Sequence, residues 1–279
     1  DVPGDVNLLG TDTGDDTIKG MLNRGNTLID GGNGTNSLTG GNGIDAITGG
    51  TGIDTINGLG GVDTINADAG ADIINGGAGD DIINGDGGID TIDGGADNDT
   101  IDGGAAADIL TGGTGNDSFV YAATADLFAT NALVDTIDGG ANTDSLVVGA
   151  NGAVFTIGVD DDFGTITSVE SIVGASSDEV ITITLHEDAV TDGIVTVDLS
   201  ADPTGDINVI NADAITGTTG MTLTGSAGAD TITGTDNADI ITGNAGIDTV
   251  NAGTGDDIVN GSAGDDILNG GGGADTING

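Results

Sequence analysis

The 279-residue chain carries 47 aspartate and glutamate residues against 2 lysine and arginine residues, giving a formal net charge of −45, and 56 of its residues are glycine. So few cations cannot neutralise a nucleic-acid backbone or an anionic membrane surface, which excludes both as partners. The absence of cysteine excludes disulfides and zinc–thiolate sites. The expected partner is therefore a hard cation bound through oxygen, and Ca²⁺ is the first candidate.

Residues 1–39 predict irregular first coils of a repeat structure. Asp16 and Ile18 match a unit that becomes regular further along the chain, displaced by a two-residue insertion. Thr27 and Asn36 stand where later units have aspartate, so we expect any ion site there to be weak. No apolar run of about 18 residues occurs, and no basic and apolar leader follows Asp1, so we expect no membrane insertion.

Nine-residue units follow one another from residue 40 to residue 120, beginning with GGNGIDAIT and ending with GGTGNDSFV. An aspartate recurs at every ninth position, and an apolar residue stands two positions after each aspartate. The aspartates are Asp45, Asp54, Asp63, Asp72, Asp81, Asp90, Asp99, Asp108 and Asp117. A fixed period of this kind indicates a solenoid of stacked repeats.

Each unit predicts a three-residue strand whose central apolar side chain points inward, joined to the next strand by a six-residue turn. Glycines five, four and two positions before the aspartate allow the positive φ that such a turn needs. Two units complete one coil, so alternate aspartates should stack on the same side, about 4.8 Å apart. Each side of the coil would then carry a column of carboxylates.

The middle of the chain departs from the period. Residues 118–134 concentrate Phe119, Tyr121, Leu127, Phe128 and Leu133, which we interpret as a hydrophobic cap rather than a binding site. A repeat-like unit returns near residues 135–148, with Asp144 in the aspartate position. Alternating apolar and polar residues then predict half-buried strands over residues 154–159, 180–185, 194–199 and 207–210. We interpret residues 121–224 as a β-rich bridging segment with longer coils.

Residues 225–279 form a second array with the same nine-residue period. Its aspartates are Asp230, Asp239, Asp248, Asp257, Asp266 and Asp275. The chain is therefore predicted to contain an N-terminal roll over residues 1–120, the bridging segment over residues 121–224 and a C-terminal roll over residues 225–279.

Stacked carboxylates make such a coil dependent on metal. Two charges about 4.8 Å apart repel each other by roughly 3.5 kcal/mol at an effective dielectric constant of about 20, and one isoleucine per unit is a small apolar core. A divalent ion between turns, held by carboxylates and backbone carbonyls, would reverse this repulsion. Extracellular calcium modules typically bind at about 10⁻⁴ to 10⁻³ M, so such sites would fill outside the cell and stay empty in the cytosol. We expect a secreted chain that folds outside the cell.

The unit resembles the G-G-x-G-x-D-x-U-x nonapeptide of the RTX (repeat-in-toxin) family, in which U is a large apolar residue. Residues 40–120 and 225–279 match it closely, and residues 10–39 and 135–148 match it loosely. The resemblance implies an all-β fold, a right-handed parallel β-roll with Ca²⁺ between its turns, and export by type I secretion. It also implies calcium ligation by Asp16, Asp144 and the aspartates of both arrays.

Some features depart from the RTX pattern. Asp97, Ala106 and Asn237 replace the glycine two positions before the aspartate, so we expect an altered turn at each of them. The sequence stops inside a repeat without the family's C-terminal secretion signal, and we expect a fragment or an end covered by a neighbour. Residues 168–182 resemble the linkers that interrupt RTX arrays in large adhesins and surface-layer proteins.

We expect no catalysis, because the single histidine, His186, has no recognisable catalytic partner and is interpreted as a surface residue. The leading hypothesis is an extracellular structural protein, a calcium-filled rod that assembles with copies of itself into a surface layer or fibre. It rests on the uncapped apolar rung at the C-terminal end, because exposed ends of stacked repeats are adhesive. The alternatives are a calcium-stabilised module of a larger secreted adhesin, toxin or enzyme, and an ice-binding protein with outward polar ladders.

Overall fold

The computed structural model of the chain describes residues 6–10, 14–20, 25–122, 127–129, 132–149, 154–158, 163–175, 180–191, 193–202 and 207–279. The chain divides into two compact units. The first comprises Asp1–Val120, Val134–Asp144 and Thr165–Ser168, and the second comprises Tyr121–Leu133, Ser145–Gly164 and Val169–Gly279. The fold is all-β, as predicted, and among the described residues no helix has the length and apolar character that crossing a bilayer requires.

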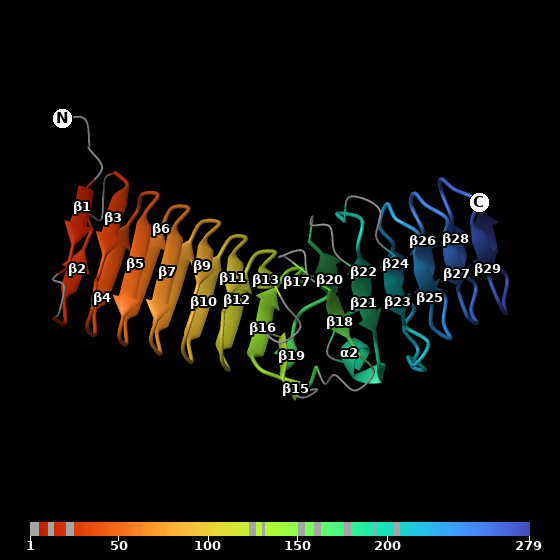
Figure 1. Ribbon diagram of the computed structural model, residues 1–279, viewed down its shortest axis with the longest axis horizontal. Coiled ribbons are helices and arrows are strands. Elements are labelled where there is room, and N and C mark those ends of the chain that lie inside the picture. The colour runs from red at the N-terminus through yellow and green to blue at the C-terminus, as the bar shows by residue number, and fades with distance from the viewer. Residues whose placement is uncertain are drawn as a thin grey trace. The chain divides into compact units, whose positions relative to one another are not determined.

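Strands of the first unit alternate between two parallel sheets, so that two successive strands make one coil (Figure 1). One sheet contains β1 (Val6–Leu9), β3 (Thr27–Asp30), β5 (Ala46–Thr51), β7 (Thr64–Ala69), β9 (Ile82–Asn84), β11 (Thr100–Asp102) and β13 (Ser118–Tyr121). The other contains β2 (Thr17–Lys19), β4 (Ser37–Gly41), β6 (Thr55–Gly60), β8 (Ile73–Ala78), β10 (Thr91–Ala96), β12 (Ile109–Thr114), β16 (Thr136–Ala141) and β19 (Ile166–Thr167). This is the parallel β-roll that the nine-residue period predicts.

The second unit repeats this arrangement. One set of parallel strands contains β17 (Ser145–Val148), β20 (Ser171–Gly174), β22 (Thr196–Asp198), β24 (Thr222–Thr224), β26 (Ile240–Thr242), β28 (Ile258–Asn260) and β30 (Thr276–Asn278). The other contains β18 (Phe155–Ile157), β21 (Ile181–Thr184), β23 (Val209–Asn211), β25 (Thr231–Thr233), β27 (Thr249–Asn251) and β29 (Ile267–Asn269). An antiparallel pair, β14 (Phe128–Ala129) and β15 (Ala132–Leu133), and a short helix, α2 (Glu187–Thr191), complete the described elements.

Coil length differs between the repeats and the bridging segment. In the repeats, Ile47 pairs with Ile65 and Ile56 pairs with Ile74, so one coil takes two nine-residue repeats. In the bridging segment Ile183 pairs with Ile210, so one coil takes as many residues as three nine-residue repeats. The four strands predicted from alternation there correspond to β18, β21, β22 and β23, each shorter than predicted. The coils of the segment are therefore longer, as the sequence indicates.

In the nine-residue repeats the core is a stack of single side chains, one for each strand, whereas in the bridging segment β18 buries both Phe155 and Ile157 and β21 buries both Ile181 and Ile183. The residue two positions after the repeat aspartate points inward, and Ile47, Ile65 and Ile83 are no more than 2 % exposed, whereas Ile277 in the last coil is 48 % exposed. Phe119, from the predicted hydrophobic cap, continues this stack and is completely buried. Neighbouring strand residues point outward, so each coil contributes little apolar area and the turns must contribute to stability as well.

Candidate calcium sites

Carboxylates of the repeats stand in columns, and hydrogen bonds join each aspartate to the next coil. Oδ1 of Asp63 accepts the backbone N–H of Asp45 at 2.8 Å, and Oδ1 of Asp81 accepts that of Asp63 at 2.7 Å. The columns of the first unit contain Asp45, Asp63, Asp81, Asp99, Asp117 and Asp144 on one side and Asp54, Asp72, Asp90, Asp108 and Asp135 on the other. Those of the second unit contain Asp230, Asp248 and Asp266, and Asp239, Asp257 and Asp275. Alternate aspartates therefore stack as predicted.

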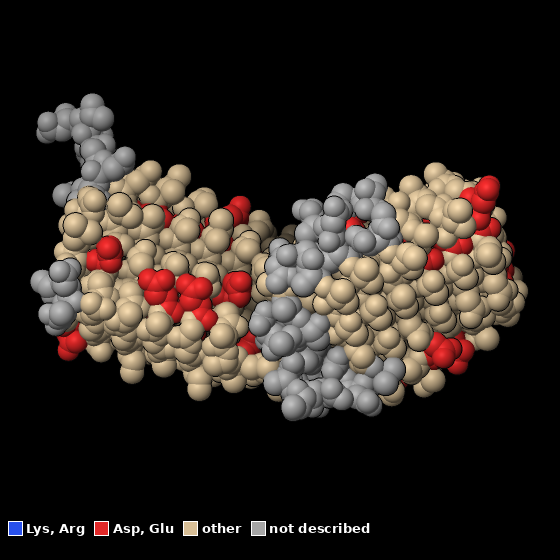
Figure 2. Space-filling model, in the orientation of Figure 1, with Lys and Arg blue, Asp and Glu red and all other residues tan. Residues whose placement is uncertain are grey.

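Most of the predicted ligands are buried, and one column member was not predicted. Asp16, Asp266 and Asp275 are half-buried, whereas the other predicted aspartates are at most 2 % exposed. Asp135, which the sequence analysis did not select, is 1 % exposed and accepts the backbone N–H of Asp108 at 2.8 Å. Its signal was the VDTID sequence, which matches the repeat from the aspartate onward. Surface carboxylates form a separate set, visible in red in Figure 2.

The second oxygen of most column carboxylates has no hydrogen-bond partner. This holds for Oδ2 of Asp45, Asp54, Asp63, Asp72, Asp81, Asp90, Asp99, Asp108, Asp248, Asp257 and Asp266. A backbone carbonyl from the next coil lies close to this second oxygen. In the Asp45 turn, a Cβ added to Gly40 would be 2.5 Å from Asp45 Oδ2 and 2.7 Å from the carbonyl oxygen of Gly58. Two buried acceptors that face each other without a donor fit a cation, since Ca²⁺ takes carboxylate and carbonyl oxygens as ligands.

Asn36 shows what happens when the column position itself brings a donor. Its Oδ1 accepts the backbone N–H of Asp16 at 3.0 Å, as an aspartate would. Its Nδ2 donates to the carbonyl oxygens of Gly34 and Gly49, at 3.3 and 3.5 Å. Gly49 corresponds to Gly58 in the Asp45 turn. The Asn36 amide therefore donates a hydrogen bond to a carbonyl whose counterpart in the Asp45 turn lies beside a carboxylate oxygen without a donor. The turns whose aspartate has a second oxygen without a donor therefore need a positive group from outside the chain.

A family model described as RTX calcium-binding nonapeptide repeat (4 copies) matches residues 23–56, 48–83, 57–92, 84–119, 216–250 and 242–277. These segments cover more than half of the chain. The chain belongs to the RTX family. Its repeats bind Ca²⁺, and the buried aspartates are consistent with several ions. No curated protein matches the chain.

The ligands of an RTX site in this chain cannot all be side chains. Among the described residues, no group of three or more histidine, cysteine, aspartate or glutamate side chains is placed to hold a metal. Backbone carbonyls must then supply the remaining oxygens, and the turns present them beside the aspartates, as Gly58 does beside Asp45. Bound Ca²⁺ would supply the positive charge that the columns lack, which makes the ion a structural component of the roll.

Burial raises the pKa of several column carboxylates. The pKa of Asp63, Asp72, Asp81 and Asp90 rises from 3.8 to about 6, and that of Asp99 rises to about 7. Loss of hydration is the largest cause, the hydrogen bond from the preceding aspartate's backbone N–H opposes it, and neighbouring carboxylates add to it. Without a cation, the buried charges of the columns therefore lower the stability of the folded roll at neutral pH.

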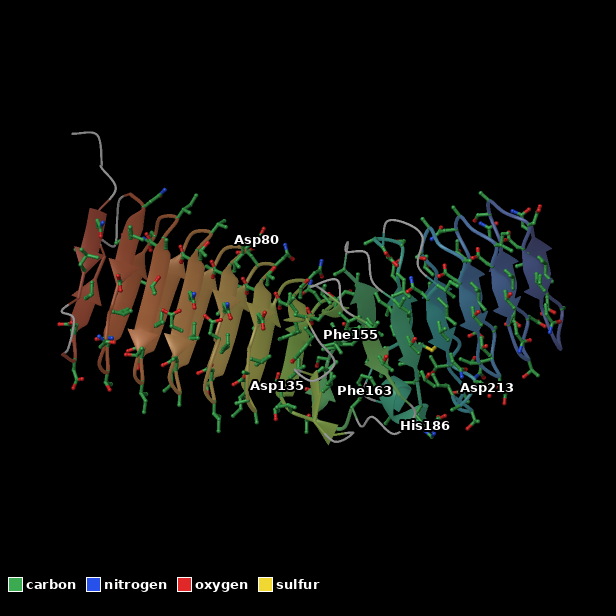
Figure 3. The ribbon with its side chains drawn as sticks, in the orientation of Figure 1. Asp80, Asp135, Phe155, Phe163, His186 and Asp213 are labelled. Atoms are coloured by element: carbon green, nitrogen blue, oxygen red, sulfur yellow. The ribbon has the colours of Figure 1, made fainter. Side chains whose placement is uncertain are left out.

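Two of the three departures from the RTX glycine pattern keep the shape of the turn. Asp97 and Ala106 have φ of +78° and +116°, in the same left-handed region as Gly79 at +119°. The altered turn that we expected is therefore not found at these two residues, although a side chain there is strained. Asn237 is not among the described residues with positive φ, and its turn does differ. His186 is exposed beside α2, as expected for a surface residue (Figure 3).

Proposed function

We propose that the chain is a non-enzymatic, extracellular structural protein whose calcium-filled coils assemble with further copies into a surface layer or fibre. The observation that carries this proposal is the column of buried carboxylates whose second oxygen has no donor. Such a coil requires a cation that is millimolar outside the cell and scarce in the cytosol. The chain would leave the cell unfolded, by type I secretion, and fold on the outer side.

Exposed aliphatic side chains support assembly. Ile240 and Ile258 are paired neighbours on β26 and β28 and are 50 % and 51 % exposed. On the first unit, Ile73 and Ile109 are 54 % and 50 % exposed and stand on β8 and β12, on either side of Thr91. Rows of exposed isoleucine suit contact with another protein surface. A net charge of −45 would keep copies apart, so contact should require bound Ca²⁺.

Electron microscopy of the purified protein tests this proposal. With millimolar calcium we expect ordered sheets or fibres, and with a chelator we expect none. The variant Ile240→Thr, Ile258→Thr should fold but assemble poorly, because threonine already occupies the paired positions Thr222 and Thr276. Dispersed monomers under all conditions would overturn assembly and favour a calcium-stabilised module of a larger secreted protein. Circular dichroism that stays β-rich in chelator would overturn the calcium requirement itself.

A further inference from the structure

Two carboxylates of the second unit have donors for both oxygens. The backbone N–H of Ser226 donates to Oδ2 of Asp230 at 2.7 Å, and the Ser226 hydroxyl lies 3.0 and 3.1 Å from the two carboxylate oxygens. Thr235 makes the same contacts with Asp239, at 2.7, 3.0 and 3.1 Å. Neither carboxylate has a buried oxygen without a partner, unlike Asp248 and Asp257 further along the same columns.

The turns that contain these contacts have a different backbone shape. Four positions before the aspartate, φ is +105° at Gly50, +115° at Gly77 and +107° at Gly253. Ser226 and Thr235, at this same position, are not among the described residues with positive φ. Their hydroxyls also accept a backbone N–H two residues on, from Gly228 at 3.0 Å and from Asn237 at 2.9 Å. In each turn the hydroxyl therefore stabilises the local backbone, and the backbone N–H of the same serine or threonine points at the carboxylate.

The chain contains an internal comparison for this conformation. The sequence Gly-Ser-Ala-Gly occurs at residues 225–228 and again at residues 261–264. In the second copy Ser262 is exposed with φ of +75°, and Oδ2 of Asp266 has no partner. Ser226, in the first copy, is 1 % exposed. The same four residues thus adopt a donor-filled turn at the start of the array and an open turn near its end.

We propose that the turns at residues 226–230 and 235–239 form a calcium-independent cap at the start of the second RTX array, in which serine and threonine hydroxyls replace the ion. A backbone N–H aimed at the carboxylate occupies the direction from which Ca²⁺ would approach, and its partial positive charge repels the ion. The proposal rests on calcium binding by the other turns. It changes the expectation for Asp230 and Asp239, which the sequence pattern alone predicts as ligands.

The cap would give calcium-driven folding a defined starting edge. Asp239 Oδ1 accepts the backbone N–H of Met221 at 2.7 Å and the backbone N–H of Asp239 donates to Asp257 Oδ1 at 2.8 Å. The cap is therefore joined on one side to the bridging coils, which contain no repeat aspartate at that position, and on the other side to the first open turn. Coils that need calcium would fold onto the cap, whose own carboxylates already have hydrogen-bond donors.

Matched substitutions in one column test the proposal. Asp239→Asn and Asp257→Asn remove the same charge from adjacent coils, and the bound calcium of each folded variant is counted by equilibrium dialysis at millimolar calcium. We expect Asp239→Asn to bind as many ions as the wild-type chain and Asp257→Asn to bind at least one fewer. Equal losses in the two variants would overturn the cap.

A second measurement needs no variant, which keeps the test decisive if Asp239→Asn does not fold. Anomalous scattering from wild-type crystals grown in millimolar calcium should place ions beside Asp248 and Asp257 and none beside Asp230 and Asp239. An ion at all four aspartates overturns the cap while leaving the calcium requirement intact. A wild-type chain that binds no calcium at all overturns both this inference and the proposed function.

Discussion

Replacing Asp81 by asparagine removes one charge from the middle of a column while preserving its shape. Asp81 is 1 % exposed, its Oδ1 accepts the backbone N–H of Asp63, and its own N–H donates to Asp99 Oδ1 at 2.8 Å. Both hydrogen bonds can persist in the variant, as Asn36 demonstrates. The change replaces Oδ2, which has no partner, by an amide that can donate to the carbonyl of Gly94.

The expected effect changes sign with calcium. At about ten times Kd one bound ion adds roughly 1.4 kcal/mol to the free energy of unfolding, so losing the site should lower the folding constant about tenfold. Without calcium, asparagine removes a buried charge whose pKa desolvation raises to about 6. The calcium-free variant should therefore be at least as stable as the calcium-free wild-type chain at neutral pH.

Urea unfolding followed by circular dichroism, at a fixed millimolar calcium concentration and again with chelator, measures both effects. Asp93→Asn is the matched control, because Asp93 lies exposed on β10 and its replacement removes the same charge. We expect the control to change stability by less than about 0.5 kcal/mol. Equal destabilisation of Asp81→Asn with and without calcium would show that the carboxylate serves the hydrogen-bond network alone, and would refute the assignment of Asp81 as a ligand.

Three further predictions concern pH, the core and the turns. In chelator, lowering the pH from about 7.5 to about 5 should increase the β-structure measured by circular dichroism. The pKa values of Asp63 and Asp99 are raised in the folded chain, so the folded chain binds more protons than the unfolded chain and is stabilised as the pH falls. A β-structure content that does not change with pH would contradict this. Ile65→Ala should cost about 2 to 5 kcal/mol in calcium-loaded urea unfolding, whereas Ile73→Ala, at a side chain 54 % exposed, should cost under about 0.5 kcal/mol. Ala106→Gly should raise stability by about 1 kcal/mol because it relieves a φ of +116°, and an unchanged melting temperature would argue against that strain.

The regular part of the fold follows from spacing alone. A period of nine with one apolar residue places Ile47 and Ile65 one above the other, and the same period stacks Asp45 on Asp63. One period therefore predicts both the core and the columns.

Position in the coil was harder to predict than the repeat itself. Asp135 lies two nine-residue repeats after Asp117 in sequence, yet it stacks on Asp108, because the coil from Asp108 to Asp135 takes 27 positions where the preceding coil from Asp90 to Asp108 takes 18. The donor-filled turn at Ser226 was also missed, since an identical tetrapeptide adopts the open turn at Ser262. The contacts of a serine hydroxyl depend on the backbone shape of its turn, which the motif does not specify.

The coil between Asp108 and Asp135 is longer than its neighbours, at 27 positions, yet the carboxylate column continues through it. Asp108 joins Asp135 and Asp117 joins Asp144 with the same hydrogen bond, 2.8 and 2.7 Å long, that links aspartates of uninterrupted coils. Loop closure costs only about 0.6 kcal/mol for each doubling of loop length. This solenoid can thus accept a lengthy guest sequence between two coils while its backbone pairing continues on either side, and an engineered version could display a foreign peptide there.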